Sequence, residues 1–315
     1  MSPARKSTRK PKTKSPKALG FISFWHCSPL VSETYYQQNL TGVIDGITRS
    51  EYPLLLKNIE GVLAGKNAPF KFLYESPLAG VVVMAPRMKK EDLKILKQVK
   101  IPVVLLYHQT EGKDFSWVDL NNREGGRLAM EHLLELGHQR IGYIGGELEL
   151  SSNARDRFDA YQKALKTAGL PFDSRLARNG FFSLDFGVES ARELLSLPVT
   201  QRPTAIFCAT DMIAFGAIQT ARKMGIKIPE HLSIVGFDNY DQAAYFSPPL
   251  TTIDQPFYEM GRIAVELLES IVEDPQRETQ QVLIEPKLIV RGSAAPPSAP
   301  PPGHKTSSFY EKLSG

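Results

Sequence analysis

The sequence holds few of the residues that build metal sites, disulfide frameworks or membrane spans. Only two of its 315 residues are cysteines, Cys27 and Cys208, and they form neither a CxxC motif nor a metal-ligand spacing. A disulfide between them is compatible with the sequence, but buried free thiols fit a reducing compartment better. No apolar run approaches the ~18 residues of a membrane span, and the charged N-terminus lacks the apolar core of a secretory signal. We therefore predict a cytoplasmic protein with no membrane partner and no bound metal.

Catalytic signatures are equally scarce. The six histidines form no HExxH or other ligand pair, and a Gly-Gly pair after one apolar run lacks both GxGxxG and a P-loop lysine. Three serines lie outside any GxSxG elbow: Ser28, Ser151 and Ser152. Asp211 and Asp238 could act as paired carboxylates in glycoside hydrolysis, although nothing else indicates a glycosidase. We predict a binding protein without a cofactor, and a hydrolase remains an alternative.

The basic charge is concentrated at one end of the chain. The first 17 residues contain no acid and seven basic side chains: Arg5, Lys6, Arg9, Lys10, Lys12, Lys14 and Lys17. Subtracting these seven from the 38 basic residues of the chain leaves 31 against 34 acidic ones, so the remainder is mildly acidic. Segment 1–17 and the proline-rich segment 294–315 have too few apolar side chains to fold, and we predict disorder in both. The basic segment suits non-specific phosphate contacts with nucleic acid, or it is a solvated arm.

Between these segments, short apolar runs alternate with amphipathic stretches. Runs suited to buried parallel strands cover 18–24, 80–84, 103–106, 141–144, 205–208 and 232–237, with 53–56 weaker. Helical periodicity covers roughly 34–48, 90–98, 123–136, 154–168, 186–196, 211–224 and 256–273, and Gly137 supplies a stop after the third. This alternation predicts an α/β protein with two Rossmann-like lobes, each built on a parallel sheet.

Aromatic, guanidinium, hydroxyl and carboxylate side chains follow the predicted strands. Trp25, Arg157, Thr210 and Asp238 all come after such runs, where open parallel sheets bind their ligands. These groups suit a polyol, because charged groups bond hydroxyls while an aromatic face covers a sugar ring. Each has a structural alternative: core packing for Trp25, an exposed helix position for Arg157 and a turn for Asp238. Asp211, next to Thr210, could simply cap the helix that follows.

Three longer segments are specific enough to indicate a family. AIFCATDMIAFGA (205–217), IPEHLSIVGFDN (228–239) and SPPLTTIDQPFYEMG (247–261) closely resemble the sensor domain of the lac repressor/gal repressor family of bacterial transcription regulators. EPKLIVRGS (285–293) resembles the closing strand of that domain, and the likeness covers about residues 18–293. The resemblance implies the type I periplasmic-binding-protein fold, in which three crossovers join the lobes. We expect an N-terminal lobe of 18–136 plus about 255–285, and a C-terminal lobe of 137–254 plus about 286–293.

The resemblance also implies which residues contact a ligand between the lobes. The implied contacts are Glu124, Arg157, Phe182, Thr210, Asp238, Gln255 and Phe257, with Arg157 as a donor and Asp238 as an acceptor. Two departures leave the ligand open: Thr210 stands where the family usually has asparagine, and Ala160 replaces a usual glycine. The implied mechanism is lobe closure on a sugar-like effector in a homodimer.

The front of the chain also departs from the family pattern. Family members begin with a helix-turn-helix headpiece that reads the major groove, whereas no recognition helix is evident in the seventeen residues before the first predicted strand. Three functions of the protein therefore remain open. The protein regulates transcription with a divergent, missing or partner-supplied headpiece; it is a stand-alone sugar or nucleoside sensor acting through protein contacts; or it is a hydrolase.

Overall fold

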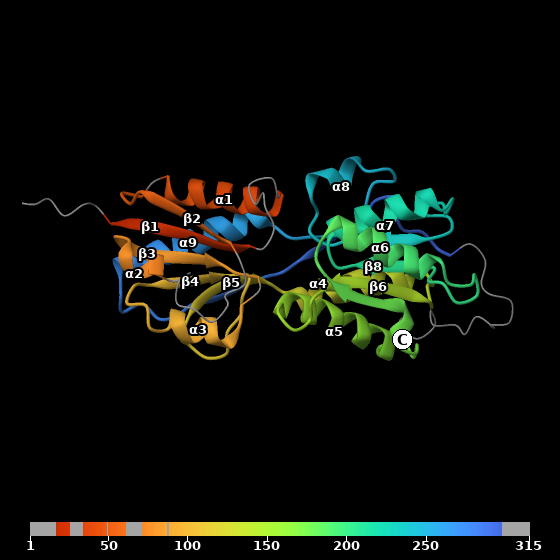
Figure 1. The fold of residues 1–315 in the computed structure, drawn as a ribbon, viewed down its shortest axis with the longest axis horizontal. Coiled ribbons are helices and arrows are strands. Elements are labelled where there is room, and N and C mark those ends of the chain that lie inside the picture. The colour runs from red at the N-terminus through yellow and green to blue at the C-terminus, as the bar shows by residue number, and fades with distance from the viewer. Residues whose placement is uncertain (1–16, 26–33, 49, 61–70, 87, 298–315) are drawn as a thin grey trace, which may run out of the picture.

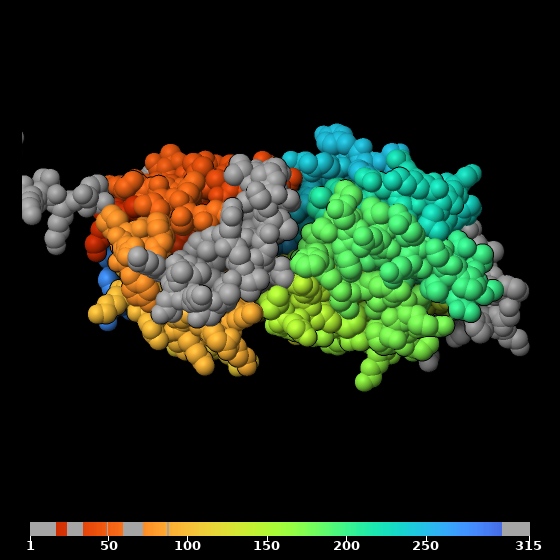
Figure 2. Space-filling view, in the orientation of Figure 1, coloured from red at the N-terminus to blue at the C-terminus, as the bar shows by residue number. Residues whose placement is uncertain are grey.

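Two parallel β-sheets lie end to end in the molecule, one in each lobe (Figure 1). The computed structural model describes residues 17–25, 34–48, 50–60, 71–86 and 88–297. In the space-filling view, the elements from β1 to β5 form one half of the molecule, and those from α4 onward form most of the other (Figure 2). The α/β fold with parallel sheets is confirmed.

The N-terminal lobe is a six-stranded parallel sheet in the order β11-β5-β4-β3-β1-β2. Its strands are β1 (Ala18–Trp25), β2 (Leu54–Glu60), β3 (Leu78–Met84), β4 (Val103–Leu106), β5 (Ser116–Leu120) and β11 (Gln281–Ile284). Its helices are α1 (Thr34–Ile47), α2 (Lys71–Glu75), α3 (Lys90–Leu96) and α9 (Phe257–Glu273).

Strand β3 explains why this sheet has helices on both faces. All seven of its residues are buried. Val82 packs into the cluster that includes α1 and α9, whereas Val81 packs with Leu73 of α2 and Leu96 of α3. Successive side chains of a strand point to opposite faces, so a continuous apolar run needs cover on both sides.

The C-terminal lobe is a four-stranded parallel sheet in the order β7-β6-β8-β9. Its strands are β6 (Ile141–Gly146), β7 (Ala177–Gly180), β8 (Ala205–Cys208) and β9 (Ser233–Val235), and β10 (Thr252–Asp254) pairs antiparallel with β12 (Lys287–Ile289) beside them. Its helices are α4 (Asn122–Glu135), α5 (Ser152–Thr167), α6 (Leu184–Leu195), α7 (Asp211–Lys223) and the short α8 (Asp241–Tyr245). Helices α4 and α5 pack together, as do α6 and α7 (Figure 1).

The predicted lobe boundary at residue 136 is wrong. Helix α4 packs on α5 of the C-terminal lobe, so the chain first crosses between the lobes near Asn121, before α4 begins. The α4–α5 contact is close: a Cβ placed on Gly126 would lie 2.6 Å from the Cβ of Ala160. Two further crossings lie between β10 and α9 and between β11 and β12. The predicted stop of α4 is confirmed, because Gly137 follows its last turn with φ +90°.

The prediction that disorder begins at residue 294 is also wrong. The backbone of Ala295 is bound to Ser233 at the start of β9, with its N–H donating to Ser233 Oγ (3.0 Å) and its carbonyl accepting from the same hydroxyl (2.9 Å). His138 Nε2 lies 3.0 Å from the same carbonyl. Hydrogen bonds of the backbone hold this end of the chain in place. The prediction of disorder considered only the number of apolar side chains and therefore missed them. The rest of the predicted C-terminal tail, 298–315, lies outside the described residues, as do residues 1–16.

Helices α1 and α9 approach each other through glycines. A Cβ on Gly42 would lie 1.9 Å from the carbonyl oxygen of Tyr258, and one on Gly261 would lie 2.2 Å from the carbonyl oxygen of Asn39. Only hydrogen fits at these two positions, so the two backbones touch without intervening side chains. The first and last helices of the N-terminal lobe therefore form one tightly packed layer.

Candidate functional site between the lobes

Arg157 of α5 lies at the centre of a buried polar group. Its Nε donates to Asn122 Oδ1 (2.8 Å), its NH1 to the Ala209 carbonyl (2.6 Å) and its NH2 to Gln255 Oε1 (3.2 Å). The side chain is 4% exposed, and its guanidinium carbon lies 3.5 Å from the centre of the Phe237 ring. Arg157 is therefore a buried guanidinium fixed by residues beside the first two crossovers, and the exposed-helix alternative is wrong.

Asp238 faces Arg157 across a loose ion pair. The NH1–Oδ1 distance is 3.7 Å, and both side chains are about 5% exposed. Burial raises the pKa of Asp238, while the Arg157 charge lowers it. Its φ of +124° is rare for a residue other than glycine, and its N–H donates to the Ile253 carbonyl (2.8 Å). Backbone strain of this kind costs about 1–3 kcal/mol and persists only where the surrounding contacts hold it.

Thr210, rather than Asp211, caps helix α7. Thr210 is the N-cap of α7, with its hydroxyl accepting from the Ile213 N–H (3.3 Å). Asp211 is the first residue of the helix, and its carboxylate accepts from the Tyr240 N–H (2.8 Å) and the Thr252 hydroxyl (2.6 Å). The interpretation of Asp211 as the cap is therefore wrong. Its carboxylate instead binds the backbone of the loop that follows Asp238.

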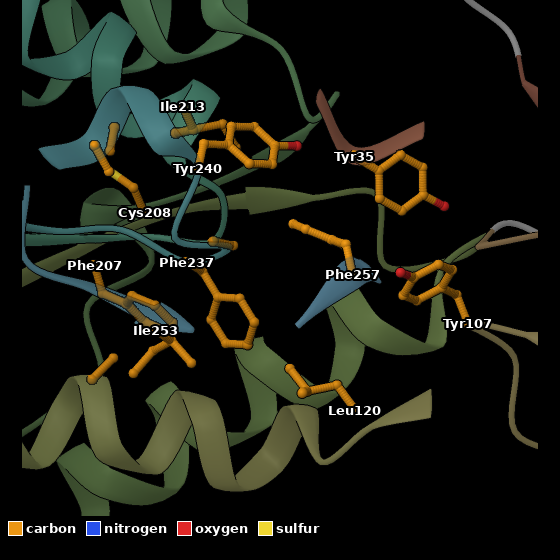
Figure 3. Packing of buried hydrophobic residues seen from close by; sticks show 14 of the residues in the cluster. Tyr35, Tyr107, Leu120, Phe207, Cys208, Ile213, Phe237, Tyr240, Ile253 and Phe257 are labelled. Carbon is orange, nitrogen blue, oxygen red and sulfur yellow. The ribbon is translucent and has the colours of Figure 1, made fainter. Parts of the chain in front are cut away.

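Aromatic rings from both lobes meet beside this pair. Phe257, the first residue of α9, lies 5.5 Å from Tyr35 and 6.5 Å from Tyr107, ring centre to ring centre. Tyr240 of the C-terminal lobe lies 5.8 Å from the same ring, and Figure 3 shows Phe257 between these tyrosines. Burial raises the pKa of Tyr35, and the negative charge of Asp238 in the other lobe raises it further. The predicted aromatic position Phe257 thus lies where the lobes meet.

A further aromatic ring, that of Phe182, lies beside Arg157. Its ring centre lies 6.0 Å from the guanidinium carbon of Arg157. A Cβ on Gly146, at the end of β6, would lie 2.2 Å from this ring, so the close approach requires glycine there. The Gly-Gly pair ends β6, its second glycine makes room for the Phe182 ring, and it has no phosphate-loop signature.

Not every predicted residue joins the group. Glu124 lies in the first turn of α4, where its carboxylate accepts two hydrogen bonds from Arg127 and is 31% exposed. Trp25 ends β1, but its side chain lies outside the described residues. The six basic residues proposed for nucleic acid also lie outside them: Arg5, Lys6, Arg9, Lys10, Lys12 and Lys14.

The structure adds residues that the sequence patterns did not indicate. Asn122 accepts from Arg157, and Asp119 of β5 is fully buried with its carboxylate accepting from the Leu120 N–H (2.8 Å) and Gln109 Nε2 (3.1 Å). Tyr107 donates to Asn39 Oδ1 (2.8 Å). A polar residue directly after or inside an apolar strand was the available signal, and it is a weak one for short strands such as β5.

Asp119 should make the folded protein less stable as pH rises. Burial raises its pKa from 3.8 to about 7, so the folded state keeps a proton that the unfolded state has lost. Between about pH 4 and pH 7 the free energy of unfolding therefore falls with pH, by up to roughly 4 kcal/mol from this group. Asp119→Asn should flatten that slope, since the amide can still accept from Leu120. Urea unfolding from pH 4.5 to 8 measures it, and equal slopes in both proteins would contradict the assignment.

The described residues show no metal site and no membrane helix. No group of three or more His, Cys, Asp or Glu side chains among them is arranged to hold an ion. No helix in this part of the chain is both long and apolar enough to cross a bilayer. Cys208 is a buried free thiol, and Cys27 lies outside the described residues.

Two parallel-sheet lobes with three crossovers and a buried polar group between them define a ligand-binding domain of the periplasmic-binding-protein class. Residues 130–294 match the family model described as a periplasmic binding protein-like domain. The chain is 31% identical over 283 residues to the HTH-type transcriptional repressor PurR of Photobacterium profundum, covering 90% of this chain and 82% of that protein. The chain belongs to the LacI family of transcriptional regulators, and its two lobes are the effector-sensing domain.

Solved structures agree with this assignment. A structure titled "transcriptional regulator CelR-cellobiose complex" superposes with a TM-score of 0.80 at 26% identity, covering 89% of this chain and 86% of that chain. A LacI family regulator from Enterococcus faecium with bound ribose gives a TM-score of 0.76 at 26% identity, covering 89% and 99%. These relatives are regulators rather than enzymes, which confirms the prediction of a non-enzymatic sensor and does not favour the stand-alone alternative.

Proposed function

We propose that the protein senses a small sugar-like effector bound between its lobes. The observation that carries this proposal is the buried Arg157–Asp238 pair, whose atoms are 3.7 Å apart and leave hydrogen-bonding capacity on both sides. Hydroxyl groups are both donors and acceptors, so a polyol can bond a guanidinium and a carboxylate together. Two regulators of similar fold carry cellobiose and ribose in their titles, which supports a sugar as the ligand class.

The aromatic rings support the same ligand class. Phe182 lies beside Arg157, and Phe257 and Tyr240 pack together where the lobes meet, so these rings can cover the apolar faces of a sugar ring. Predicted contacts at Thr210 and Gln255 remain part of the proposal. Thr210 is 7% exposed, and Gln255 already bonds Arg157. Trp25 and Glu124 stay in the proposal as predicted ligand contacts.

Binding would be read out by movement of the lobes. A ligand that bonds residues of both lobes favours the closed form by its differential affinity for that form. We propose that a homodimer carries this change to DNA, and that the protein works in the cytoplasm, where its target DNA lies. The repressor function of the Photobacterium relative supports this output.

Asp238→Asn should abolish most of the sugar affinity while preserving the fold. Asparagine tolerates the positive φ of this position, and it keeps the shape of the side chain but loses the charge. Hydrogen bonds to charged groups contribute about 1.5–3 kcal/mol, so affinity should fall by roughly tenfold to a hundredfold. A thermal-shift screen of pentoses, hexoses and nucleosides finds the ligand, and calorimetry measures the loss.

The matched control is Asp173→Asn, which removes a partly exposed carboxylate paired with Arg175 in the same lobe. It should leave sugar affinity unchanged. Equal affinities in wild type and Asp238→Asn would place the site elsewhere. Stabilisation by nucleosides alone would replace the sugar with a nucleoside.

A further inference from the structure

Asn239, the residue directly after Asp238, bonds two other segments of the chain through its side-chain amide. Its Nδ2 donates to Asp254 Oδ1 (2.7 Å), and its Oδ1 accepts from Arg291 NH2 (2.6 Å). An amide can make both bonds because it carries a donor and an acceptor, whereas an ionised carboxylate only accepts. Both partners are charged groups, which makes these bonds stronger than bonds between neutral groups. Asn239 is therefore the middle member of a chain of three polar side chains.

The backbone at Asp238 and Asn239 forms a turn with two successive positive φ angles, +124° and +55°. Such angles are uncommon outside glycine, and asparagine and aspartate tolerate them better than most side chains. The far end of the turn is held by the Tyr240 N–H, which donates to the Asp211 carboxylate (2.8 Å). The two hydrogen bonds of the Asn239 side chain hold the turn directly beside Asp238.

The partners of Asn239 lie on or beside the two strands that adjoin the second and third crossovers. Asp254 is the last residue of β10, and α9 of the N-terminal lobe begins three residues later. Arg291 lies two residues after β12, and its NH1 also donates to the Leu250 carbonyl before β10 (2.8 Å). Strands β10 and β12 pair with each other. The Asn239 side chain therefore ties the turn at Asp238 to the paired strands next to two of the three crossovers.

We propose that Asn239 is a positioning residue that fixes the Asp238 carboxylate in the direction that a ligand requires. Its own side chain holds the turn, and the turn determines where the carboxylate of the preceding residue points. A shift of β10 and β12 during lobe movement therefore changes the position of Asp238. A ligand bonded to Asp238 in return favours one arrangement of these strands. This inference rests on the proposed sugar site and names a residue that sets its affinity through Asp238.

An exchange of two side chains tests the proposal on the full chain. Asn239→Asp keeps an acceptor for Arg291 but loses the donor and places a second carboxylate beside Asp254, so affinity should fall about tenfold. Adding Asp254→Asn restores both hydrogen bonds with donor and acceptor exchanged, and affinity should return to within about threefold of wild type. Calorimetry measures the affinity for four probes: D-ribose, D-glucose, D-galactose and cellobiose.

A second comparison separates positioning from a merely structural role. In a protein that already carries Asp238→Asn, adding Asn239→Asp should cost less than about twofold in affinity, because the carboxylate to be positioned is gone. A merely structural role would make the two losses add. The control is Gln201→Glu, which also replaces an amide by a carboxylate, at an exposed position before β8 in the same lobe. This control should bind the sugars as wild type does.

Unchanged affinity in Asn239→Asp, or a loss that Asp254→Asn does not restore, would overturn the positioning role and leave the proposed function standing. A loss that adds in full to that of Asp238→Asn would also overturn it, because Asn239 would then act independently of Asp238. Binding of a nucleoside in place of all four sugars would overturn the sugar as the ligand class. The same variants, measured with that nucleoside, would then test Asn239 separately.

Discussion

Arg157→Ala is expected to lower the free energy of unfolding by about 3–5 kcal/mol, even without a ligand. The change removes the only positive charge paired with buried Asp238 among the described residues, and removal of one partner from a buried pair costs this much. It also leaves the oxygens of Asn122, Gln255 and Ala209 without their donor. Urea unfolding at pH 8 measures the loss.

Two comparisons identify the cause of that loss. Without Arg157, the pKa of Asp238 rises further, so the folded protein binds a proton more readily and the deficit should be smaller at pH 5 than at pH 8. Adding Asp238→Asn to Arg157→Ala removes the unpaired charge and should restore part of the stability. Arg175→Ala, at an exposed arginine, should cost less than about 1 kcal/mol. A deficit that does not change with pH, and is not reduced in the double variant, would contradict the electrostatic explanation.

Gly42→Ala is expected to destabilise the N-terminal lobe by at least about 3 kcal/mol. The added Cβ would lie 1.9 Å from the Tyr258 carbonyl oxygen, which belongs to backbone and cannot rotate away. The helices must separate, and overpacking that shifts side chains and backbone typically costs about 1–3 kcal/mol, and occasionally more, as we expect where the added atom would overlap a backbone oxygen. Denaturant unfolding followed by circular dichroism provides the measurement.

Thr41→Ala is the matched control, because Thr41 is the preceding residue on the exposed face of the same helix. Alanine has a higher helix propensity than threonine, so this variant should be as stable as wild type or slightly more stable. If Gly42→Ala behaved like Thr41→Ala, the close contact between α1 and α9 would be disproved.

Sequence periodicity predicted most helices and strands, but it did not predict to which lobe helix α4 belongs. The apolar positions of α4, such as Leu128, Met130 and Leu133, show that the helix has a buried face, but they do not say which sheet that face meets. Its assignment to the N-terminal lobe was therefore wrong. The sequence did not predict strand β5, because SWVDL is short and includes two polar residues, although all five residues of the strand are buried. The lobe of α4 and the strand β5 are both determined by tertiary contacts, which a local sequence pattern does not show.

The candidate site was predictable where strand ends carry charged residues, and less so elsewhere. Asp238 follows a buried strand directly, which is a signal that the residues alone provide. Asn122 and Asp119 gave only the weaker signal of a polar residue inside or just after a short strand, since their importance depends on packing across a crossover and within a sheet. Glu124 shows the opposite limit: the resemblance implies a ligand contact, whereas in this structure its carboxylate pairs with Arg127.

The contact between α1 and α9 also has a consequence for biosynthesis. The ribosome makes α9 only after α4 to α8 and the four strands of the C-terminal sheet have emerged, because the chain returns to the first lobe at residue 257. The lobe that is translated first is therefore the one that waits for a missing helix, with the α1 face and the β3–β5 surface exposed to solvent until then. Domains generally fold as they emerge, and long-range closures are slow. The four-stranded sheet of the second lobe with α4 to α8 should fold first, with only β12 and the segment to Ala295 added later, and the nascent N-terminal sheet is where a chaperone would be needed.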